Sequence, residues 1–185
     1  AVSVYGILMY VDGFIQPLLY GTCDSLQPAV GFNWGAGKYS RVRAIEKCCF
    51  AASIVISLAA VAVILLFPQP ITQLFMADAG PEALAMSIGA LQLFAITYLT
   101  RWFSFATQSY LLAVEKSWQA SVISVSTALI FPVVLVGVLW PLGLTGIWLN
   151  FAGTAVLAGI LAAVLLLKLR PELSRPDEEL TPKTR

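Results

Sequence analysis

Long uninterrupted runs of apolar residues dominate the chain and predict its secondary structure. Residues 48–77 carry no charged side chain, and neither do residues 117–167. A run of about 18 or more apolar residues is long enough to cross a bilayer as a helix. The runs are continuous rather than alternating, which favours helices over a β-barrel. With proline and glycine as breakers, the pattern predicts five spans, at about residues 2–34, 48–67, 83–114, 117–140 and 144–167.

Composition changes this picture from a set of helices to a membrane protein. Of the 185 residues, 59% are apolar and 11% are charged, whereas a soluble domain carries about 25% charged residues. We therefore expect an all-α integral membrane protein that has the lipid bilayer as its solvent. The tail, residues 169–185, is rich in proline and glutamate and is expected to be disordered.

Several classes of function are disfavoured by the same counts. A net charge of +1 gives no basic excess for nucleic acid. The chain has no histidine and three cysteines, which argues against histidine catalysis, a histidine metal site and a disulfide scaffold. No nucleophile–base pair is visible. We expect no enzymatic activity, no metal, no cofactor and no nucleic-acid partner.

The distribution of basic residues predicts the orientation of the chain. Ten of the eleven Lys and Arg residues lie in three segments, which are residues 38–47, Lys116 and the stretch from Lys168 onward. These segments alternate along the predicted spans, so the positive-inside rule places them in the cytoplasm. The amino end is then external and the tail cytoplasmic, in the plasma (inner) membrane. The chain also begins with Ala1 inside an apolar run, which predicts further chain before it.

The most specific motif is Gln27-Pro28-x-x-Gly31-Phe32-Asn33-Trp34-Gly35-Ala36. It resembles the end of the eighth helix in the multidrug and toxic compound extrusion (MATE) family. The resemblance implies helices eight to twelve of a twelve-helix transporter, most of its carboxyl-terminal lobe, with the amino-terminal lobe missing. It also implies a secondary antiporter that exports drugs or other organic compounds in exchange for Na⁺ or H⁺. Our interpretation of the motif itself (Gln27, Pro28, Gly31, Asn33 and Gly35) is that it shapes a helix end.

Three ionisable residues, Asp12, Asp24 and Arg101, fall inside the predicted spans. Ionisable residues in a membrane are costly, so each is a candidate for function. Helical spacing places Asp24 near mid-depth and Asp12 nearer the external mouth. The expected partner of Arg101 is Asp24 or Asp12, and the pair serves either as a structural ion pair or as a switch that a coupling ion or substrate opens.

Two helix faces complete the candidate substrate or coupling-ion pathway. The first helix carries a polar band, broken at Pro17 in our interpretation, and the third carries aromatic and polar residues on one face. Aromatic rings beside polar groups suit amphipathic or cationic organic substrates through cation–π contact. The pathway candidates are Asp12, Gln16, Tyr20, Asp24, Gln27, Tyr98, Arg101 and Gln108.

An alternative function is a lipid-linked oligosaccharide flippase of the same superfamily. Arg101 within the membrane suits an anionic pyrophosphate headgroup better than a cationic drug. Small and polar residues on the last two spans, among them Thr127, Gly146, Asn150 and Gly153, are interpreted as helix-packing positions.

Overall fold

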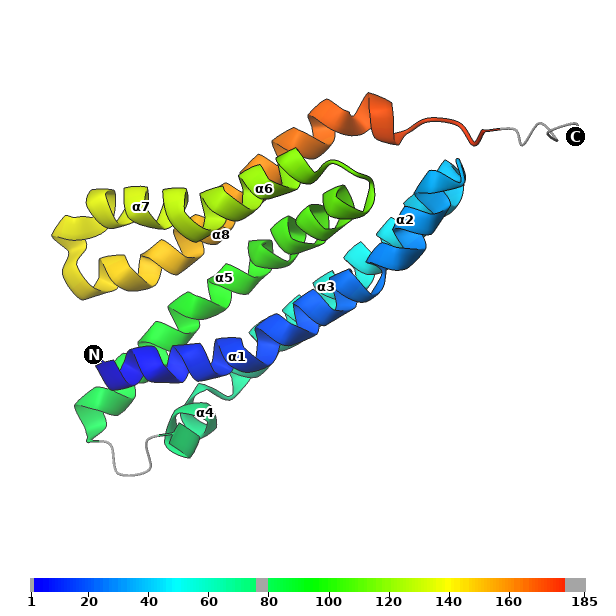
Figure 1. Ribbon diagram of the computed structural model, residues 1–185. Helices are drawn as coiled ribbons and strands as arrows, with labels where there is room; N and C mark the ends of the chain where they lie inside the picture. Colours follow the sequence, from blue (N-terminus) through cyan, green and yellow to red (C-terminus); the bar gives the residue numbers. More distant parts are fainter. Residues whose placement is uncertain (1, 76–79, 179–185) are drawn as a thin grey trace, which may run out of the picture.

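The computed structural model describes residues 2–75 and 80–178, and every regular element in these ranges is helical. Most of the chain lies in long helices, and the shorter helical elements lie between them or interrupt them (Figure 1). The elements are α1 (Val2–Ser25), α2 (Gln27–Gly35), α3 (Tyr39–Leu66), α4 (Pro68–Phe75), α5 (Pro81–Ala113), α6 (Ser117–Val125), the π-helix η1 (Ser126–Ile130), α7 (Phe131–Leu139), the 3₁₀ turn η2 (Trp140–Leu142) and α8 (Gly143–Leu173).

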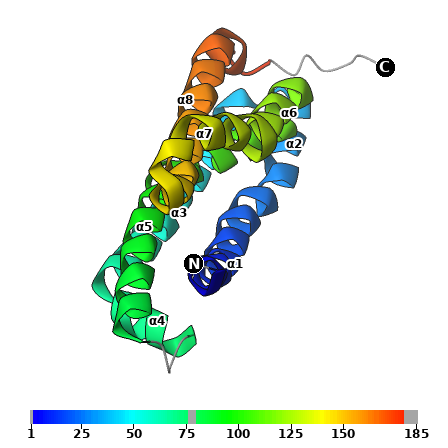
Figure 2. The same cartoon turned by 90° about the vertical axis from the view of Figure 1, so that its left-hand side faces the viewer.

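Helix α5 is the central element of the bundle. It packs against α1 and α3 on one side and against α6 and α8 on the other (Figure 1). In the view turned by 90°, α1 and α2 lie to one side of α5 and α8 (Figure 2). Many buried residues of α5 are serine, threonine or alanine, and small side chains let neighbouring helices approach closely.

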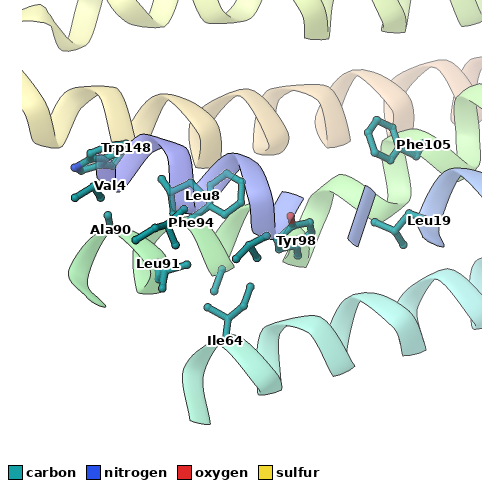
Figure 3. Close-up of a cluster of buried hydrophobic side chains, with 13 residues drawn as sticks. Val4, Leu8, Leu19, Ile64, Ala90, Leu91, Phe94, Tyr98, Phe105 and Trp148 are labelled. Carbon is teal, nitrogen blue, oxygen red and sulfur yellow. The ribbon is translucent and has the colours of Figure 1, made fainter. Parts of the chain in front are cut away.

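The main apolar core joins four helices around aromatic residues of α5 (Figure 3). Leu8 of α1, Ile64 of α3 and Trp148 of α8 all reach this cluster. The Phe94 ring lies edge-on to the rings of Tyr98 and Phe151, with centroid distances of 5.6 and 5.3 Å. The core thereby holds α1 against α5 at the level where polar groups gather.

Among the residues that the structure describes, three stretches are long and apolar enough to cross a membrane, which are α3, α5 and residues 117–173. The third has 57 residues, and at about 1.5 Å per residue one straight helix of that length would far exceed a bilayer. It is folded in two, because the chain reverses at η2 and Gly143 adopts a φ of +56°. Helix α7 then packs antiparallel to α8 (Figure 1). The first predicted span, α1, is not among the three stretches.

The break in the first predicted span does not fall at Pro17, where the sequence placed it. Helix α1 continues through Pro17, and the break falls at Leu26 instead. Pro28 then lies in the first turn of α2, where its missing N–H leaves no helical hydrogen bond unmade. The sequence interpretation of a break at Pro17 was therefore wrong.

Helix α3 begins at Tyr39, earlier than the predicted start at residue 48. Gly37 has a φ of +67°, and the Lys38 N–H donates to the Asn33 carbonyl oxygen at 2.9 Å. The Gly37 N–H donates to the Trp34 carbonyl oxygen, which completes a Schellman ending for α2. This tight turn replaces the predicted basic loop, so most of its basic residues lie on the first turns of α3. The predicted loop after α3 likewise contains a short helix, α4.

The fourth predicted span is interrupted by the π-helix η1, which ends just before Phe131-Pro132. A proline inside a helix removes a backbone donor, and the extra residue of a π-turn is a common accommodation. The Asn150 side chain on α8 donates to the Pro132 carbonyl oxygen at 3.2 Å. This bond connects α8 to the start of α7, directly after the π-helix.

Residues 170–178 belong to the predicted tail, and in the structure they contact α3 and the α5–α6 turn. Helix α8 continues to Leu173, and Glu172 forms an ion pair with Lys116. The Asp177 carboxylate accepts hydrogen bonds from the Ser40 backbone N–H (2.6 Å) and hydroxyl (2.5 Å). The Tyr39 hydroxyl donates to Glu178 at 2.8 Å. The rest of the predicted tail, residues 179–185, lies outside the described residues.

The hairpin of α7 and α8 generates a first prediction. A Cβ atom at Gly146 would lie 2.4 Å from the Leu139 carbonyl oxygen, whereas one at Gly137 would meet open space. We expect Gly146→Ala to destabilise the protein by about 1–3 kcal/mol through overpacking. Gly137→Ala, the matched control, should be neutral or stabilising because alanine favours helix. Thermal unfolding in detergent, followed by circular dichroism, measures both; equal melting temperatures would contradict the close packing.

The tail contact generates a second prediction. Hydrogen bonds from the side chain and then the backbone of Ser40 hold the pKa of the Asp177 carboxyl below its ordinary value. The docked tail therefore favours the ionised form, so its stabilisation is complete above about pH 4 and is lost as the pH falls through the lowered pKa. Spin labels at Arg41 and Pro176 should separate on acidification.

Asp177→Asn is the control for this titration. Its label separation at neutral pH should already resemble that of the acidified wild type, since the amide lacks the charge that Ser40 binds. A short separation that persists at every pH, in both proteins, would contradict the carboxylate's role.

Candidate functional site

The first polar cluster lies between α1 and α5, within the apolar core. Asp12 is 9% exposed. One of its carboxylate oxygens accepts a hydrogen bond from the Tyr98 hydroxyl at 2.6 Å and another from the Arg101 guanidinium at 2.9 Å. The Asp12 and Arg101 side chains are 12% and 18% exposed. Of the two partners expected for Arg101, the structure selects Asp12.

Aromatic rings border the Asp12–Arg101 pair. The Arg101 guanidinium carbon lies 5.2 Å from the centre of the Phe105 ring, within the range of a cation–π contact. Tyr20 of α1 stacks on the other side of this arrangement, with its ring centre 4.3 Å from that of Phe105. Gln16, one turn earlier on α1, lies beside Tyr20. The predicted polar band of α1 therefore faces α5.

A cavity of about 240 Å³ opens beside the pair. It lies between α1, α5, η1 and α8, and the Asp12 and Arg101 side chains form part of its wall. Two further wall groups, the Thr97 and Thr127 hydroxyls, are buried and make no hydrogen bond to the described residues. The other polar wall residues are Ser104, Asn150 and Thr154. Such unpartnered hydroxyls in a charged cavity are suited to holding water, a cation or a polar ligand group.

The second polar cluster also joins α1 and α2 to α5. It lies about three turns from the first cluster as counted along α1. The Gln27 amide donates to Asp24 at 2.8 Å and to the Ser109 hydroxyl at 2.9 Å, and Ser109 donates to Asp24 at 3.1 Å. Asp24 itself is exposed in this chain. The structure thus brings Asp24 together with Gln27, as expected, but not with Arg101.

These contacts reverse the predicted order of the two carboxylates in depth. Ser109 lies four residues before the end of α5, so the Asp24 cluster is only about 6 Å from that end of the helix. Arg101 lies two turns deeper in α5, and with it Asp12. Along α5, Asp12 therefore lies nearer the middle of the helix than Asp24, whereas the sequence placed Asp24 near mid-depth and Asp12 nearer the external mouth.

The helix-end motif has structural contacts in this chain. A Cβ atom at Gly31 would lie 3.5 Å from the Ala113 carbonyl oxygen, so this glycine marks the close approach of α2 to α5. The Asn33 amide donates to the Ala29 carbonyl oxygen of its own helix at 2.8 Å. Gly35 is exposed and faces open space. Within the motif, Gln27 alone belongs to a polar cluster described above.

Some pathway candidates lie apart, and sequence reasoning missed others. Gln108 is half-buried on α5 and belongs to neither cluster. Ser109, its neighbour, was missed because a single serine in an apolar helix carries no pattern. Thr127 and Asn150 were interpreted as packing residues, yet both line the cavity. Pro132 was the available signal, since a proline within a span indicates irregular backbone next to a cavity.

In residues 2–75 and 80–178, no group of three or more His, Cys, Asp or Glu side chains is arranged to hold a metal ion. The available chemistry is that of carboxylates, hydroxyls, amides and one guanidinium. These groups can bind cations and protons and can orient a polar ligand.

Comparisons with known proteins bear on the family. A family model described as MatE matches residues 1–137. The chain is similar to a solved MATE multidrug transporter, DinF-BH in complex with R6G, with 28% identity, a TM-score of 0.84 and coverage of 94% of this chain and 39% of that one. A search of curated proteins finds no match. The family resemblance inferred from residues 27–36 is confirmed.

Two further solved structures share the fold. One is the outward-facing conformation of a multidrug resistance MATE family transporter of the MOP superfamily (17% identity, TM-score 0.84, 95% of this chain and 40% of that one). The other is an inward-facing conformation described in the same words (18%, 0.77, 92% and 39%). The chain therefore spans about two fifths of the length of the solved transporters that it matches.

The Asp12–Arg101 pair generates a third prediction. Removing one partner of a buried pair leaves an uncompensated charge, which costs about 3–5 kcal/mol. We expect Arg101→Gln to lower the melting temperature in detergent strongly, and Asp12→Asn with Arg101→Gln together to recover part of the loss. Asp24→Asn, at an exposed carboxylate, is the comparison and should change stability less. A double variant as unstable as the sum of its singles would rule out the pairing.

Proposed function

Because this chain belongs to the MatE family of transporters, we propose that it forms helices eight to twelve of a twelve-helix secondary antiporter. These helices are most of the carboxyl-terminal lobe, and an amino-terminal lobe of the same protein completes the transport path. The antiporter exports drugs or other organic compounds in exchange for Na⁺ or H⁺. Two lobes rocking around a shared central site would provide alternating access.

The observation that carries the proposal is the central carboxylate of Asp12 beside a cavity. Asp12 and Arg101 together bear no net charge, and both contact the same space of about 240 Å³. An ion pair needed only for stability could be packed without such a space. A carboxylate that also faces a polar cavity is accessible to a coupling cation, which supports a role beyond structure.

Charge balance suggests how exchange works at this site. When a proton or Na⁺ binds Asp12, its attraction for Arg101 weakens and the cavity gains one positive charge. An organic cation would then bind less well, and conversely its presence would disfavour the coupling cation. A ligand shifts a conformational equilibrium only by binding one state better than the other. Mutual exclusion at a single neutral pair satisfies that condition for both ligands.

The surroundings of the pair fit an amphipathic or cationic substrate. Phe105 and Tyr20 place two stacked rings beside the guanidinium, and a flat organic cation can bind such rings by stacking and cation–π contact. A similar transporter was solved in complex with R6G, which supports a drug-sized organic substrate for this protein as well.

Asp24 supports a path that extends toward the other lobe. Its carboxylate is exposed in this chain although it lies on a helix of the apolar bundle. A charge facing lipid would be costly, so such groups face a protein or water-filled interior. We propose that the amino-terminal lobe or the central cavity covers Asp24, with Gln27 and Ser109 orienting it.

The lipid-linked oligosaccharide flippase is the less supported alternative. A pyrophosphate headgroup would require an uncompensated cation, and the charge of Arg101 is balanced by Asp12 at 2.9 Å. The orientation we propose has the basic segments in the cytoplasm, in the plasma (inner) membrane, with the amino end of this chain external.

The experiment uses the complete transporter expressed in drug-sensitive cells. Asp12→Asn keeps the shape and the hydrogen-bond acceptor for Tyr98 but removes the charge, so we expect drug efflux per molecule of folded transporter in the membrane to fall at least about tenfold. Glu82→Gln, at an exposed carboxylate in the first turn of α5, is the matched control and should export normally.

Export at the wild-type rate by the Asp12 variant would eliminate Asp12 as the coupling carboxylate. A wild-type transporter that moves no organic compound, with either an H⁺ or a Na⁺ gradient, would overturn the proposed antiport itself.

A further inference from the structure

Glu46 is a carboxylate that the proposed site does not use, and the fold draws it into the bundle. Because α3 begins at Tyr39, Glu46 lies two turns inside a helix rather than in a loop. It is half-buried, at the level of Tyr110 on α5. Tyr110 directly follows Ser109, whose hydroxyl donates a hydrogen bond to Asp24.

An inner cavity lies between Glu46 and the Asp24 cluster. Gln27 and Ser109, the two hydrogen-bond donors to Asp24, line it together with Glu46 and Tyr110. The cavity encloses about 10 Å³, which is about the minimum room for one water molecule. The buried Tyr110 hydroxyl lies beside the Glu46 carboxyl, and both side chains line the space for such a water.

An outer cavity lies on the other side of the same two residues. It has a volume of about 280 Å³ and is lined by Glu46 and Tyr110 together with Arg43, Arg170 and Ser174. The two arginines belong to the basic end of the bundle, where α3 begins and α8 ends (Figure 1). Glu46 and Tyr110 are thus the shared wall between the Asp24 cluster and that end.

We propose that Glu46 is a proton-relay residue that connects Asp24 with the aqueous phase at the basic end of the bundle. This inference rests on the proposed antiport and names H⁺ as its coupling ion. A proton leaving the Asp24 carboxyl passes to the Ser109 hydroxyl, whose own proton passes to a water in the inner cavity. That water gives a proton to the Glu46 carboxylate, and Glu46 releases it to water in the outer cavity. Each transfer breaks one O–H bond and forms another, and no oxidant or reductant is needed.

The charged and titratable groups around Glu46 suit this task. Arg43 on α3 and Arg170 on α8 line the outer cavity together with Glu46, at the end where Glu46 releases the proton to water. Tyr110 on α5 and the thiols of Cys23 and Cys49 border the inner cavity. Glu46 is therefore the carboxylate that lines both the inner and the outer cavity.

The test measures proton movement coupled to drug exchange in the complete transporter, reconstituted in vesicles with a pH-sensitive dye inside. Glu46→Gln cannot carry a proton, so we expect the coupled proton flux to fall at least about tenfold, while equilibrium drug binding changes less than about twofold. Glu115→Gln, at an exposed carboxylate in the α5–α6 turn, is the matched control and should behave as wild type.

Glu46→Asp is the second variant and keeps the relay in place if Glu46→Gln fails to fold. A carboxyl with a lower ordinary pKa should shift the pH profile of proton flux toward lower pH, whereas a merely structural Glu46 would leave the profile unmoved.

Wild-type flux in a folded Glu46→Gln protein, or an unmoved profile in Glu46→Asp, would overturn the relay. So would wild-type export that is driven by Na⁺ with no proton release, although the antiport would then stand. Failure of the wild type to exchange with either ion would instead overturn the antiport.

Discussion

The ion pair between Asp12 and Arg101 is the interaction around which this lobe is organised. It joins α1 to the central helix α5 at 2.9 Å inside an apolar core, where an isolated charge would be prohibitively costly. Tyr98 adds a third polar group from the same helix. The pair therefore fixes the rotation of α1 against α5, and that rotation in turn sets which side chains meet further along both helices.

Because the pair fixes how α1 lies along α5, a second polar layer forms nearer the basic end of the bundle, where α3 begins and α8 ends. Gln27 and Ser109 hold Asp24 there, and Glu46 reaches the same level from α3. The stacked rings of Tyr20 and Phe105 lie between the two layers. The deeper layer borders the larger internal cavity, whereas the shallower one is divided from the bundle end by little more than Glu46 and Tyr110. This gradient of access fits the proposed cation coupling, in which the coupling ion would reach a buried carboxylate from one side at a time.

Irregular backbone supplies the rest of the geometry. The Schellman turn at Gly37 lets α3 start early and brings Glu46 into the bundle, and the π-helix before Pro132 bends the rod that walls the main cavity. Helices that were straight from end to end would pack their small residues closely and leave less room for a ligand. The same turn contacts residues 177 and 178, because the Glu178 N–H donates to the Gly37 carbonyl oxygen and the Ser40 N–H donates to Asp177.

The sequence alone determined the environment, the helical class and the family. Apolar runs can satisfy their backbone groups in lipid only as helices, and the residues from Gln27 to Ala36 form a local motif that the family match confirms. It also marked Asp12, Asp24 and Arg101, because charges are conspicuous in apolar runs. Only the tertiary structure decided which carboxylate pairs with Arg101, that Asp12 lies deeper than Asp24, and that Ser109, Thr127 and Glu46 line cavities. The physical reason is that helix register and rotation depend on packing between elements far apart in the chain. Where nearly every face of a helix is apolar, periodicity in the sequence carries little information about which face packs against which neighbour.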